Sequence, residues 1–418
     1  MKKYYFIYLA ALLFSPLSAC SCEGDHDAEW NLDDEWPEAD AGEEDILEDD
    51  TAEEQDAKDE PIEPWEPEEV EPDIPYDHAL TDRTSLDVDP DGTLWLGYHY
   101  CSDLSCSEPM LRVMHKRVGQ DWVGEDIAIH EGIFGVNVIM ADEPIVVYPD
   151  SFEPVYRVKS RTSDGQWESY DFPVPRGDQM EYDGFDVTEN GHSYFITFAP
   201  DNAPQVSLFT LDVAASAPTW RELSPLEIQD SQAAMEDGLQ TDEDNVYLVN
   251  LSGETGIYGV YRYDQELDQW PQTAELQTYT DLFVHSLAIT QNFGLCMSGN
   301  YQGGTNVETL LVTCGSMDDL TLEVKDFGEG SLSAETPSSI IEGNDGTVYV
   351  AFNPPGNREL RVASRRPNTP VWEVETVYNG PSYGISTAID HSGDLVISFY
   401  TCDDEDRCSL KVLWETMD

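Results

Sequence analysis

The chain has 418 residues, of which 85 are Asp or Glu and 20 are Lys or Arg, so its formal net charge at pH 7 is −65. Such a charge repels phosphate backbones and excludes nucleic acid as a partner. With 40% hydrophobic residues, the chain is long enough to bury a substantial core.

The first 19 residues have the order of a secretory signal peptide. Lys2 and Lys3 precede an apolar run from Tyr4 to Phe14, and export signals share this charged and then apolar order. Because a membrane-spanning helix needs about 20 apolar residues, the run is too short to be one. The sequence therefore predicts that the chain is exported.

The end of this segment, Leu17-Ser18-Ala19-Cys20, resembles the bacterial lipobox. The resemblance implies cleavage before Cys20 and acylation of that cysteine, and several acyl chains on one residue anchor firmly in membrane lipid. Residue 21 is Ser rather than the Asp that retains enterobacterial lipoproteins at the inner membrane, which implies the outer membrane or the cell surface. An ordinary cleavage site with a chance cysteine remains the alternative.

An acidic segment follows the anchor. Between Glu23 and Asp73 there are 26 Asp and Glu residues and one Lys. A segment of this composition cannot bury enough apolar surface to offset chain entropy, and its charges repel one another. Residues 20–75 are therefore predicted to be the lipid anchor and a disordered acidic linker. Binding of cations or of a basic partner by this run is the alternative.

Residues 76–418 contain a repeat. Seven segments share a short strand, a turn with Gly, Asn or Asp, and a stronger strand, and they begin at Ser85, Val136, Phe185, Leu239, Ser286, Ser338 and Ser386. Another strand follows each segment, and in five of the seven a tryptophan opens a final edge strand: Trp122, Trp167, Trp220, Trp270 and Trp372. Four strands per repeat predict an all-β fold, a seven-bladed β-propeller, with six or eight blades if one repeat is misread.

Turn chemistry supports the hairpins. Positive φ angles, which tight two-residue loops require, are expected at Asp91-Gly92, Asn190-Gly191, Asp345-Gly346 and Ser392-Gly393. The last segment ends after three strands, so its outer strand is expected from residues just before Ser85, within Tyr76–Arg83. A ring closed by strands from both ends of the chain removes free sheet edges.

One tryptophan turn, Thr162-Ser163-Asp164-Gly165-Gln166-Trp167, is the closest match to an Asp box, without the usual spacing between Asp and Gly. On this turn and the repeated Trp positions, the chain resembles exported propellers with Asp-box and sialidase-like repeats. The resemblance implies a tryptophan packed between blades, and it implies no enzyme because the Asp box is structural. A sialidase needs an arginine triad, whereas Arg residues here are few and cluster on outer strands, as at Arg358, Arg361, Arg365 and Arg366.

Six cysteines pair by position, in keeping with an oxidising compartment. The predicted disulfides join Cys101 to Cys106, Cys296 to Cys314, and Cys402 to Cys408. The first and third pairs occupy equivalent loops of the first and last segments, and the second pair faces across a hairpin. Metal binding by the first pair is the alternative, and Cys22 has no assigned partner.

Propeller ligands usually bind at the mouth of the central channel, near the loops that lead into the innermost strands. Two such loops, Met180–Gly184 and Met235–Gly238, are near copies that present paired carboxylates. Such pairs can act as acid and base, or they can bind calcium. The catalytic candidates are Glu181, Asp183, Glu236 and His285, the calcium candidates are Asp183 and Asp237, and the binding candidates are Arg83, Glu181 and Tyr383. Solvated turn residues in a very acidic protein are the alternative.

A second acidic motif, from Asp87 to Gly92, resembles the start of an EF-hand loop. Tyr98 stands where that loop needs its Glu, and a strand hairpin accounts for the residues. The sequence therefore favours a hairpin over a calcium loop here.

Two functions remain. The favoured one is a surface-anchored, monomeric binding or scaffolding propeller whose rim recognises a protein or a glycan. The alternative is an extracellular hydrolase or lyase acting on glycans, with its site at the channel mouth. Calcium is the one cofactor for which the sequence offers candidates.

Overall fold

The computed structural model describes only part of the chain, within the second of its two units, Glu60–Asp418. The described residues are 65, 67–75, 84–101, 109–117, 119–129, 136–141, 143–150, 155–173, 185–187, 193–198, 205–215, 218–227, 231–241, 246–252, 257–264, 267–270, 272–277, 282–302, 308–316, 319–330, 338–354, 359–403 and 407–415. The predicted signal peptide, Cys20 and nearly all of the acidic segment lie outside them. Within the described ranges, no helix is long and apolar enough to cross a membrane.

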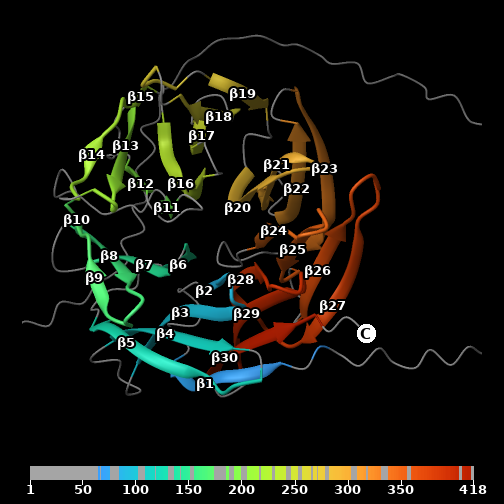
Figure 1. Cartoon of the computed structure of the whole chain (residues 1–418). Helices are drawn as coiled ribbons and strands as arrows, with labels where there is room; N and C mark the ends of the chain where they lie inside the picture. The colour runs from blue at the N-terminus through green and yellow to red at the C-terminus, as the bar shows by residue number, and fades with distance from the viewer. Residues whose placement is uncertain are drawn as a thin grey trace, which may run out of the picture. The chain divides into compact units, whose positions relative to one another are not determined.

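The strands form seven antiparallel sheets, each of which is one blade (Figure 1). Blade 1 contains β2 (Ser85–Val88), β3 (Thr93–Cys101), β4 (Pro109–Arg117) and β5 (Val123–Ile129). Blade 2 contains β6 (Asn137–Met140), β7 (Pro144–Pro149), β8 (Val155–Arg161), β9 (Trp167–Ser169) and β10 (Phe172–Pro173). Blade 3 contains β11 (Phe185–Val187), β12 (Ser193–Phe198), β13 (Gln205–Asp212), β14 (Arg221–Glu222) and β15 (Leu226–Glu227).

The other four blades follow the same plan. Blade 4 contains β16 (Ser231–Thr241), β17 (Val246–Ser252), β18 (Ile257–Tyr263) and β19 (Gln272–Gln277). Blade 5 contains β20 (Leu282–Thr290), β21 (Gly294–Gln302), β22 (Glu308–Ser316) and β23 (Asp319–Gly330). Blade 6 contains β24 (Ser339–Glu342), β25 (Val348–Phe352), β26 (Glu359–Arg365) and β27 (Glu373–Asn379). Blade 7 contains β28 (Tyr383–Ile389), β29 (Leu395–Cys402), β30 (Arg407–Trp414) and β1 (Glu68–Pro75).

The innermost strands of successive blades are neighbours in a closed circle. The order is β2, β6, β11, β16, β20, β24 and β28, and β28 in turn contacts β2. The fold is therefore the all-β, seven-bladed propeller that the repeat predicts. Second strands such as β7 and β29 are buried along almost their whole length, which explains their continuous apolar sequence.

The strand that closes blade 7 is not the predicted one. Its outer strand is β1, which pairs antiparallel with β30 from Glu68↔Val412 to Pro75↔Arg407. The prediction of Tyr76–Arg83 was wrong, and the described fold begins within the stretch assigned to the linker. Ile74 is buried in the core shared by blades 7 and 1, and Val70 packs against the same core, so two apolar side chains anchor an otherwise acidic strand.

The inner hairpins use a longer turn than predicted. In blade 1 the backbone N–H of Asp89 bonds to Thr93 O at 2.9 Å, and the N–H of Gly92 bonds to Asp89 O at 2.9 Å. This pattern encloses three residues, with φ +82° at Gly92, and three-residue loops of this kind need a glycine at their last position. Gly346 and Gly393 repeat it with φ of +80° and +92°, whereas Asn190-Gly191 lies outside the described residues. The predicted positive φ is thus confirmed at three glycines, but the prediction of two-residue loops was wrong.

Tryptophans pack between blades as predicted. Trp122, Trp167, Trp220, Trp270 and Trp372 all lie against core clusters that join neighbouring blades. Three of the indole N–H groups also bond to the outer part of the preceding blade: Trp167 to Glu125 Oε2, Trp220 to Tyr170 O, and Trp270 to Ser224 O, each at 2.9 Å. Each of these three indoles therefore joins two blades by both packing and a hydrogen bond.

Two of the predicted disulfides are present. Cys296 and Cys314 are directly paired residues of β21 and β22, and Cys402 and Cys408 pair in the same way at the end of β29 and the start of β30. The predicted bond between Cys101 and Cys106 falls outside the described side chains. Each of the two observed disulfides joins two adjacent strands of one blade.

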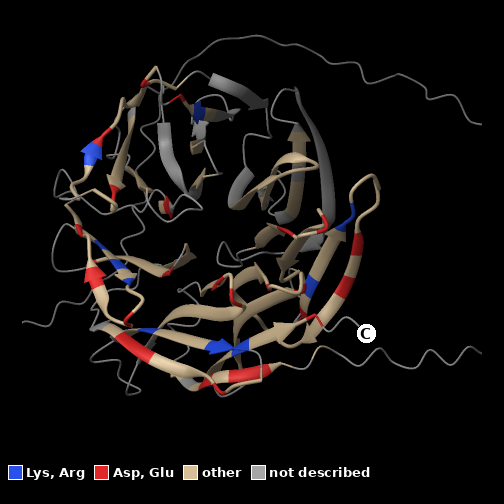
Figure 2. Ribbon diagram, in the orientation of Figure 1, with Lys and Arg blue, Asp and Glu red and all other residues tan. Residues whose placement is uncertain are grey.

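Charged side chains have a regular placement. Third strands carry cations, such as Arg112 on β4, Arg157 on β8 and Arg361 on β26, while the outer strands β1, β5 and β27 carry Asp and Glu (Figure 2). The two kinds pair, as in Arg112–Asp126 at 2.7 Å and Arg157–Asp171 at 2.6 Å. Charges along an outer strand discourage pairing with another chain's edge.

Candidate functional site

The channel-mouth candidates fall largely outside the described part of the chain. Arg83, Glu181 and Asp183 lie outside it entirely. Glu236 and Asp237 lie in β16 and His285 in β20, so their backbone belongs to inner strands rather than to the expected loops, and their side chains are not described. The structure therefore tests neither the acid-base pair nor the calcium site.

Tyr383, the remaining binding candidate, opens β28. Its side chain is half-buried and packs against the core cluster that joins blades 7 and 1. In this position the ring contributes to packing between blades.

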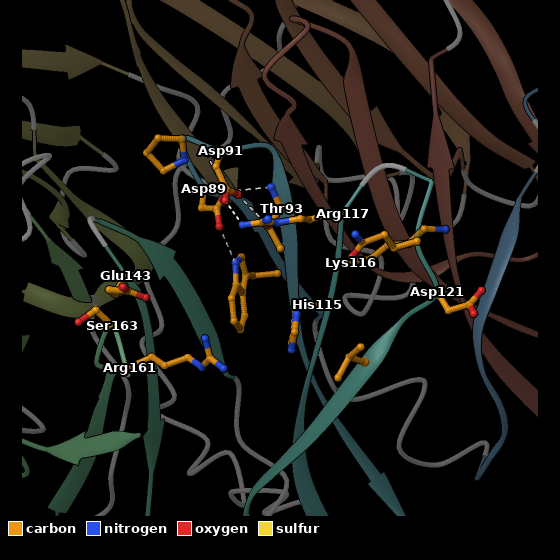
Figure 3. A pocket seen from close by; sticks show the side chains of 14 residues that line it. Asp89, Asp91, Thr93, His115, Lys116, Arg117, Asp121, Glu143, Arg161 and Ser163 are labelled. Atoms are coloured by element: carbon orange, nitrogen blue, oxygen red, sulfur yellow. Dashed lines mark hydrogen bonds and ion pairs between the residues drawn. The ribbon is translucent and has the colours of Figure 1, made fainter. Parts of the chain in front are cut away.

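A pocket of about 640 Å³ lies between blades 1 and 2 (Figure 3). We call it the blade 1–2 pocket, and its main side chains are Asp89, Asp91, Trp95, His115, Arg117 and Arg161. The turns that border it join first to second strands and third to fourth strands, as at Asp91, Gln120 and Glu143. In an up-and-down sheet these turns lie at the opposite end from the loops that enter the inner strands. The pocket is thus on the opposite face from the predicted site.

The inner wall of the pocket is a stack of aromatic and charged groups. Trp95 of β3 is 3% exposed, the His115 ring lies 4.5 Å from it in a stacked arrangement, and the Arg161 guanidinium lies 5.3 Å from the Trp95 ring centre. Cations placed over an indole face are attracted by its quadrupole. Packing of this kind leaves the three groups little freedom to rotate.

The carboxylate of Glu125 contacts side chains of both blades at this wall. One of its carboxylate oxygens lies 3.0 Å from Arg161 Nη2 and 3.3 Å from His115 Nε2, and the other accepts the Trp167 indole N–H at 2.9 Å. Burial lowers the pKa of His115, and the negative charge of Glu125 opposes this shift. A single carboxylate therefore orients groups from both blades.

The rim of the pocket is the β2–β3 turn. Asp89 Oδ1 accepts bonds from the N–H groups of Asp91 and Thr93 at 2.9 and 2.8 Å, and Asp89 Oδ2 accepts the Trp95 indole N–H at 3.2 Å. These bonds belong to a strand hairpin, as the sequence favours, and within the described residues no cluster of His, Cys, Asp or Glu is suited to a metal ion. The turn is therefore fixed by its own side chains.

Asp91 and Arg117 form an exposed ion pair on this rim. Their side chains are 51% and 57% exposed, and Arg117 Nε also donates to Thr93 Oγ1 at 3.1 Å. A hydrogen bond from Asp89, together with Thr93 and the charge of Arg117, lowers the pKa of Asp91 to about 2, while burial raises that of Asp89. A fixed carboxylate and a fixed guanidinium thus face solvent side by side.

Sequence reasoning did not identify this pocket. A signal for it does exist, because third strands in blades 1, 2 and 6 all end in arginine, at Arg117, Arg161 and Arg365. In a chain with only 20 Lys and Arg residues, this repetition indicates a fixed role at one end of the strands. Arg365 lies 4.7 Å from the Phe293 ring centre, so stacking on an aromatic ring recurs in blade 6.

No protein-family model matches the sequence, and no curated protein matches it. Solved structures similar to the described fold include the polysaccharide lyase Uly1, at 10% identity and a TM-score of 0.49, over 79% of this chain and 89% of that one. The SapL1 lectin in complex with alpha methyl fucoside has 8% identity and a TM-score of 0.44, over 73% and 99%. NanB sialidase from Streptococcus pneumoniae has 9% identity and a TM-score of 0.41, over 79% and 68%. One fold serves many activities, and likenesses of this size carry no information about ligand or reaction.

The class of protein that the structure defines is a seven-bladed β-propeller with a polar pocket between two blades.

Proposed function

We propose that the protein is a surface-anchored binding propeller and that the blade 1–2 pocket holds a glycan. The observation that carries the proposal is the Asp91–Arg117 pair on the rim, since both groups are fixed by the same turn and both remain exposed. Adjacent hydroxyl groups of a sugar each donate and accept hydrogen bonds. A carboxylate beside a planar guanidinium offers the matching acceptors and donors.

The size and lining of the pocket support this ligand class. Its volume of about 640 Å³ falls within the range of roughly 300–1,000 Å³ that is usual for small-molecule sites. The lining mixes carboxylates, cations, Gln120 and Ser163, so it offers hydrogen bonds in several directions. The groups are already oriented by Glu125 and Asp89, so a ligand would find them in place, which reduces the entropy cost of binding.

The proposal is tested by applying the purified chain to an array of bacterial, algal and plant polysaccharides and measuring the affinity of each hit by calorimetry. Asp91→Asn combined with Arg117→Gln should weaken binding at least tenfold. Asp345→Asn is the matched control, because Asp345 occupies the same turn position in blade 6 and bonds to Thr347 as Asp91 bonds to Thr93. Absence of any bound glycan, or equal binding by the pocket variant, would contradict the proposal. Release of shortened or unsaturated products from a bound glycan would instead identify the hydrolase or lyase.

A further inference from the structure

A second pocket, of about 300 Å³, lies between blades 6 and 7. We call it the blade 6–7 pocket, and its main side chains are Glu69, Tyr378, Thr401, Arg407, Ser409 and Lys411. It borders the turn from β29 to β30, which joins a second strand to a third strand (Figure 1). In an up-and-down sheet this turn lies at the opposite end from the turns that border the blade 1–2 pocket. The two pockets are therefore separate.

The alternation of side chains along β30 decides which of them face the blade 6–7 pocket. Leu410 and Val412 belong to the core shared by blades 7 and 1, whereas Leu413 belongs to the core shared by blades 6 and 7. Successive side chains of a strand point to opposite faces of the sheet. Ser409 and Lys411 therefore lie on the same face as Leu413, toward blade 6 and the pocket.

Aromatic rings give the Lys411 ammonium group a defined position. Lys411 is directly paired with Phe399 of β29, and its Nζ lies 5.7 Å from the ring centre of Tyr378. The Tyr378 ring in turn lies 5.0 Å from the Phe399 ring. On another side, a Cβ at Gly380 would lie only 2.6 Å from Tyr378 Cε1. The backbone at Gly380 and the Phe399 ring thus hold the tyrosine, which holds the ammonium by a cation–π contact.

Hydroxyl groups line the pocket beside this ammonium. Thr401 of β29 and Ser409 of β30 are directly paired residues, and the Tyr378 hydroxyl shares a hydrogen bond of 3.2 Å with Thr401 Oγ1. A hydroxyl can donate one hydrogen bond and accept others. The pocket therefore combines one fixed cation with hydroxyl groups from both blades.

Lys411 differs from other cations on third strands. Arg112, Lys116 and Arg157 all form ion pairs with carboxylates, whereas Lys411, within the described residues, forms none. Its side chain is nevertheless half-buried. Removing a charge from water without a partner is costly, and an ammonium bonded to a carboxylate regains this cost. A ligand with a carboxylate would supply the missing partner.

The carboxylates of the pocket do not fill this role. Asp403 is bound by Arg407, whose Nε, Nη2 and backbone N donate to it at 2.9, 2.7 and 3.0 Å. Glu69 is directly opposite Lys411 in the β1–β30 ladder, but it is exposed and forms no ion pair with Lys411 within the described residues. The unused hydrogen-bonding capacity of the pocket is therefore that of a cation and hydroxyl groups.

We propose that the blade 6–7 pocket binds a sugar acid, with the carboxylate of the ligand on Lys411 and its hydroxyl groups on Ser409 and Thr401. The volume of about 300 Å³ is at the lower end of the usual range for small-molecule sites, which suits a single sugar unit. A ligand with one negative charge is repelled by the acidic surface far less than a polyanion, because salt screens distant charges. The site goes beyond the proposed glycan site, since it is a different pocket with a different ligand.

The first test compares three small probes by calorimetry on the purified chain. D-Glucuronate and D-glucose differ in carrying a carboxylate or a hydroxymethyl group, and glucuronate should bind at least about fivefold more tightly. Acetate, which has the carboxylate alone, should bind more weakly than glucuronate. Equal affinity for glucuronate and glucose would overturn the role of the carboxylate, and equal affinity for acetate would overturn the sugar. Binding of none of the three would overturn the site.

The second test locates the bound probe. Lys411→Gln should weaken glucuronate binding about tenfold, and Lys411→Arg, which keeps the charge, should retain part of it. Lys159→Gln is the matched control, because Lys159 is also on a third strand and bonds only to the exposed Ser169 hydroxyl. Unchanged affinity in Lys411→Gln, or an equal loss in Lys159→Gln, would overturn the assignment.

Glu69→Gln gives a test of sign. If the ligand is an anion, removal of the charge opposite Lys411 should strengthen glucuronate binding about twofold. Weaker binding would show that Glu69 accepts hydrogen bonds from the ligand and would overturn the proposal. The double variant Asp91→Asn and Arg117→Gln, which alters the blade 1–2 pocket, should leave glucuronate affinity unchanged. Loss of glucuronate binding in that variant would overturn the blade 6–7 site, and failure of the chain to bind glycans would leave it standing.

Discussion

Asp87 Oδ2 accepts a 2.7 Å hydrogen bond from the backbone N–H of Met140, so one carboxylate of blade 1 fixes the inner strand of blade 2. Burial raises the pKa of Asp87 to about 6 from 3.8, although the bonds from Met140 and Val88 oppose the shift. Between about pH 4 and pH 6 the folded chain holds a proton that the unfolded chain has released. Stability from this group is therefore present below pH 4 and is lost as the pH rises to 6.

Asp87→Asn should remove this dependence, because the amide keeps an acceptor for Met140 and cannot ionise. The free energy of unfolding of the wild type relative to Asp87→Asn should fall by about 2 to 3 kcal/mol between pH 4 and pH 7, measured by urea denaturation. Asp345→Asn, in an exposed turn, is the control for the loss of one negative charge. A difference that stays constant with pH would contradict the assignment.

A comparison of Trp167→Phe with Trp122→Phe should separate the contribution of the indole hydrogen bond to stability from the contribution of indole packing. Trp167 donates to Glu125, so its replacement should lower the free energy of unfolding by about 1 to 2 kcal/mol through the lost bond, in addition to the cost of the smaller ring. Trp122 makes no such bond among the described residues. Its replacement should therefore lower the free energy of unfolding only by the packing that the smaller ring loses. Equal losses in chemical denaturation would argue against a role for the hydrogen bond.

Gly92→Ala should be more destabilising than Gly119→Ala. Both glycines have positive φ, +82° and +77°, which costs an alanine about 1 to 2 kcal/mol. A Cβ at Gly92 would in addition lie 2.7 Å from His391 Nδ1 of blade 7, whereas at Gly119 nothing lies within 4 Å. Thermal unfolding of the two variants should therefore differ in midpoint, and identical midpoints would show that His391 moves aside freely.

Peptide mapping without reduction should recover Cys296 joined to Cys314 and Cys402 joined to Cys408. Replacing a pair with alanines should lower the free energy of unfolding by about 3 kcal/mol for the first and about 2 kcal/mol for the second, because the first closes a longer loop. Free thiols at all four positions in the protein purified without reductant would contradict the structure. The same map would test the predicted bond between Cys101 and Cys106.

If the predicted lipobox is used, Cys20→Ala should release the chain from the membrane fraction and abolish labelling with a fatty-acid probe. The reason is that a lipid-modified cysteine is the only membrane attachment that the sequence predicts. Ser18→Thr, which keeps a small residue in the motif, is a suitable control. Membrane association that persists without a lipid signal would contradict the lipoprotein hypothesis.

The sequence predicted the blades because their information is local. Hairpins such as Ser85–Cys101 carry alternating apolar residues, a glycine where φ must be positive, and a tryptophan about 30 residues downstream. It did not predict β1 because an outer strand needs few apolar residues, and Glu68–Pro75 offers Val70 and Ile74 among charges and prolines. The partner of β1 is at the far end of the chain, so no local pattern marks it.

The blade 1–2 pocket was missed for a different reason. Its chemistry depends on groups from two blades meeting, as when Glu125 of β5 contacts Arg161 of β8. Taken singly, Asp91 is a turn residue and Arg117 is one more charged strand end. Only the side-by-side arrangement of the two blades brings Arg161 and Ser163 next to these groups and forms the pocket.

Ring closure through β1 has a mechanical consequence. This strand is the first strand of the described fold, and Trp65 just before it packs against the core shared by blades 6 and 7. Tension applied from upstream would therefore act first on Trp65 and then on the Glu68–Lys116 pair and the irregular β1–β30 ladder, while the other blades are held by hairpins of their own. Under rising force β1 would detach from the junction between blades 7 and 1 before any other strand unfolds. Three strands of blade 7 and six complete blades would then remain folded.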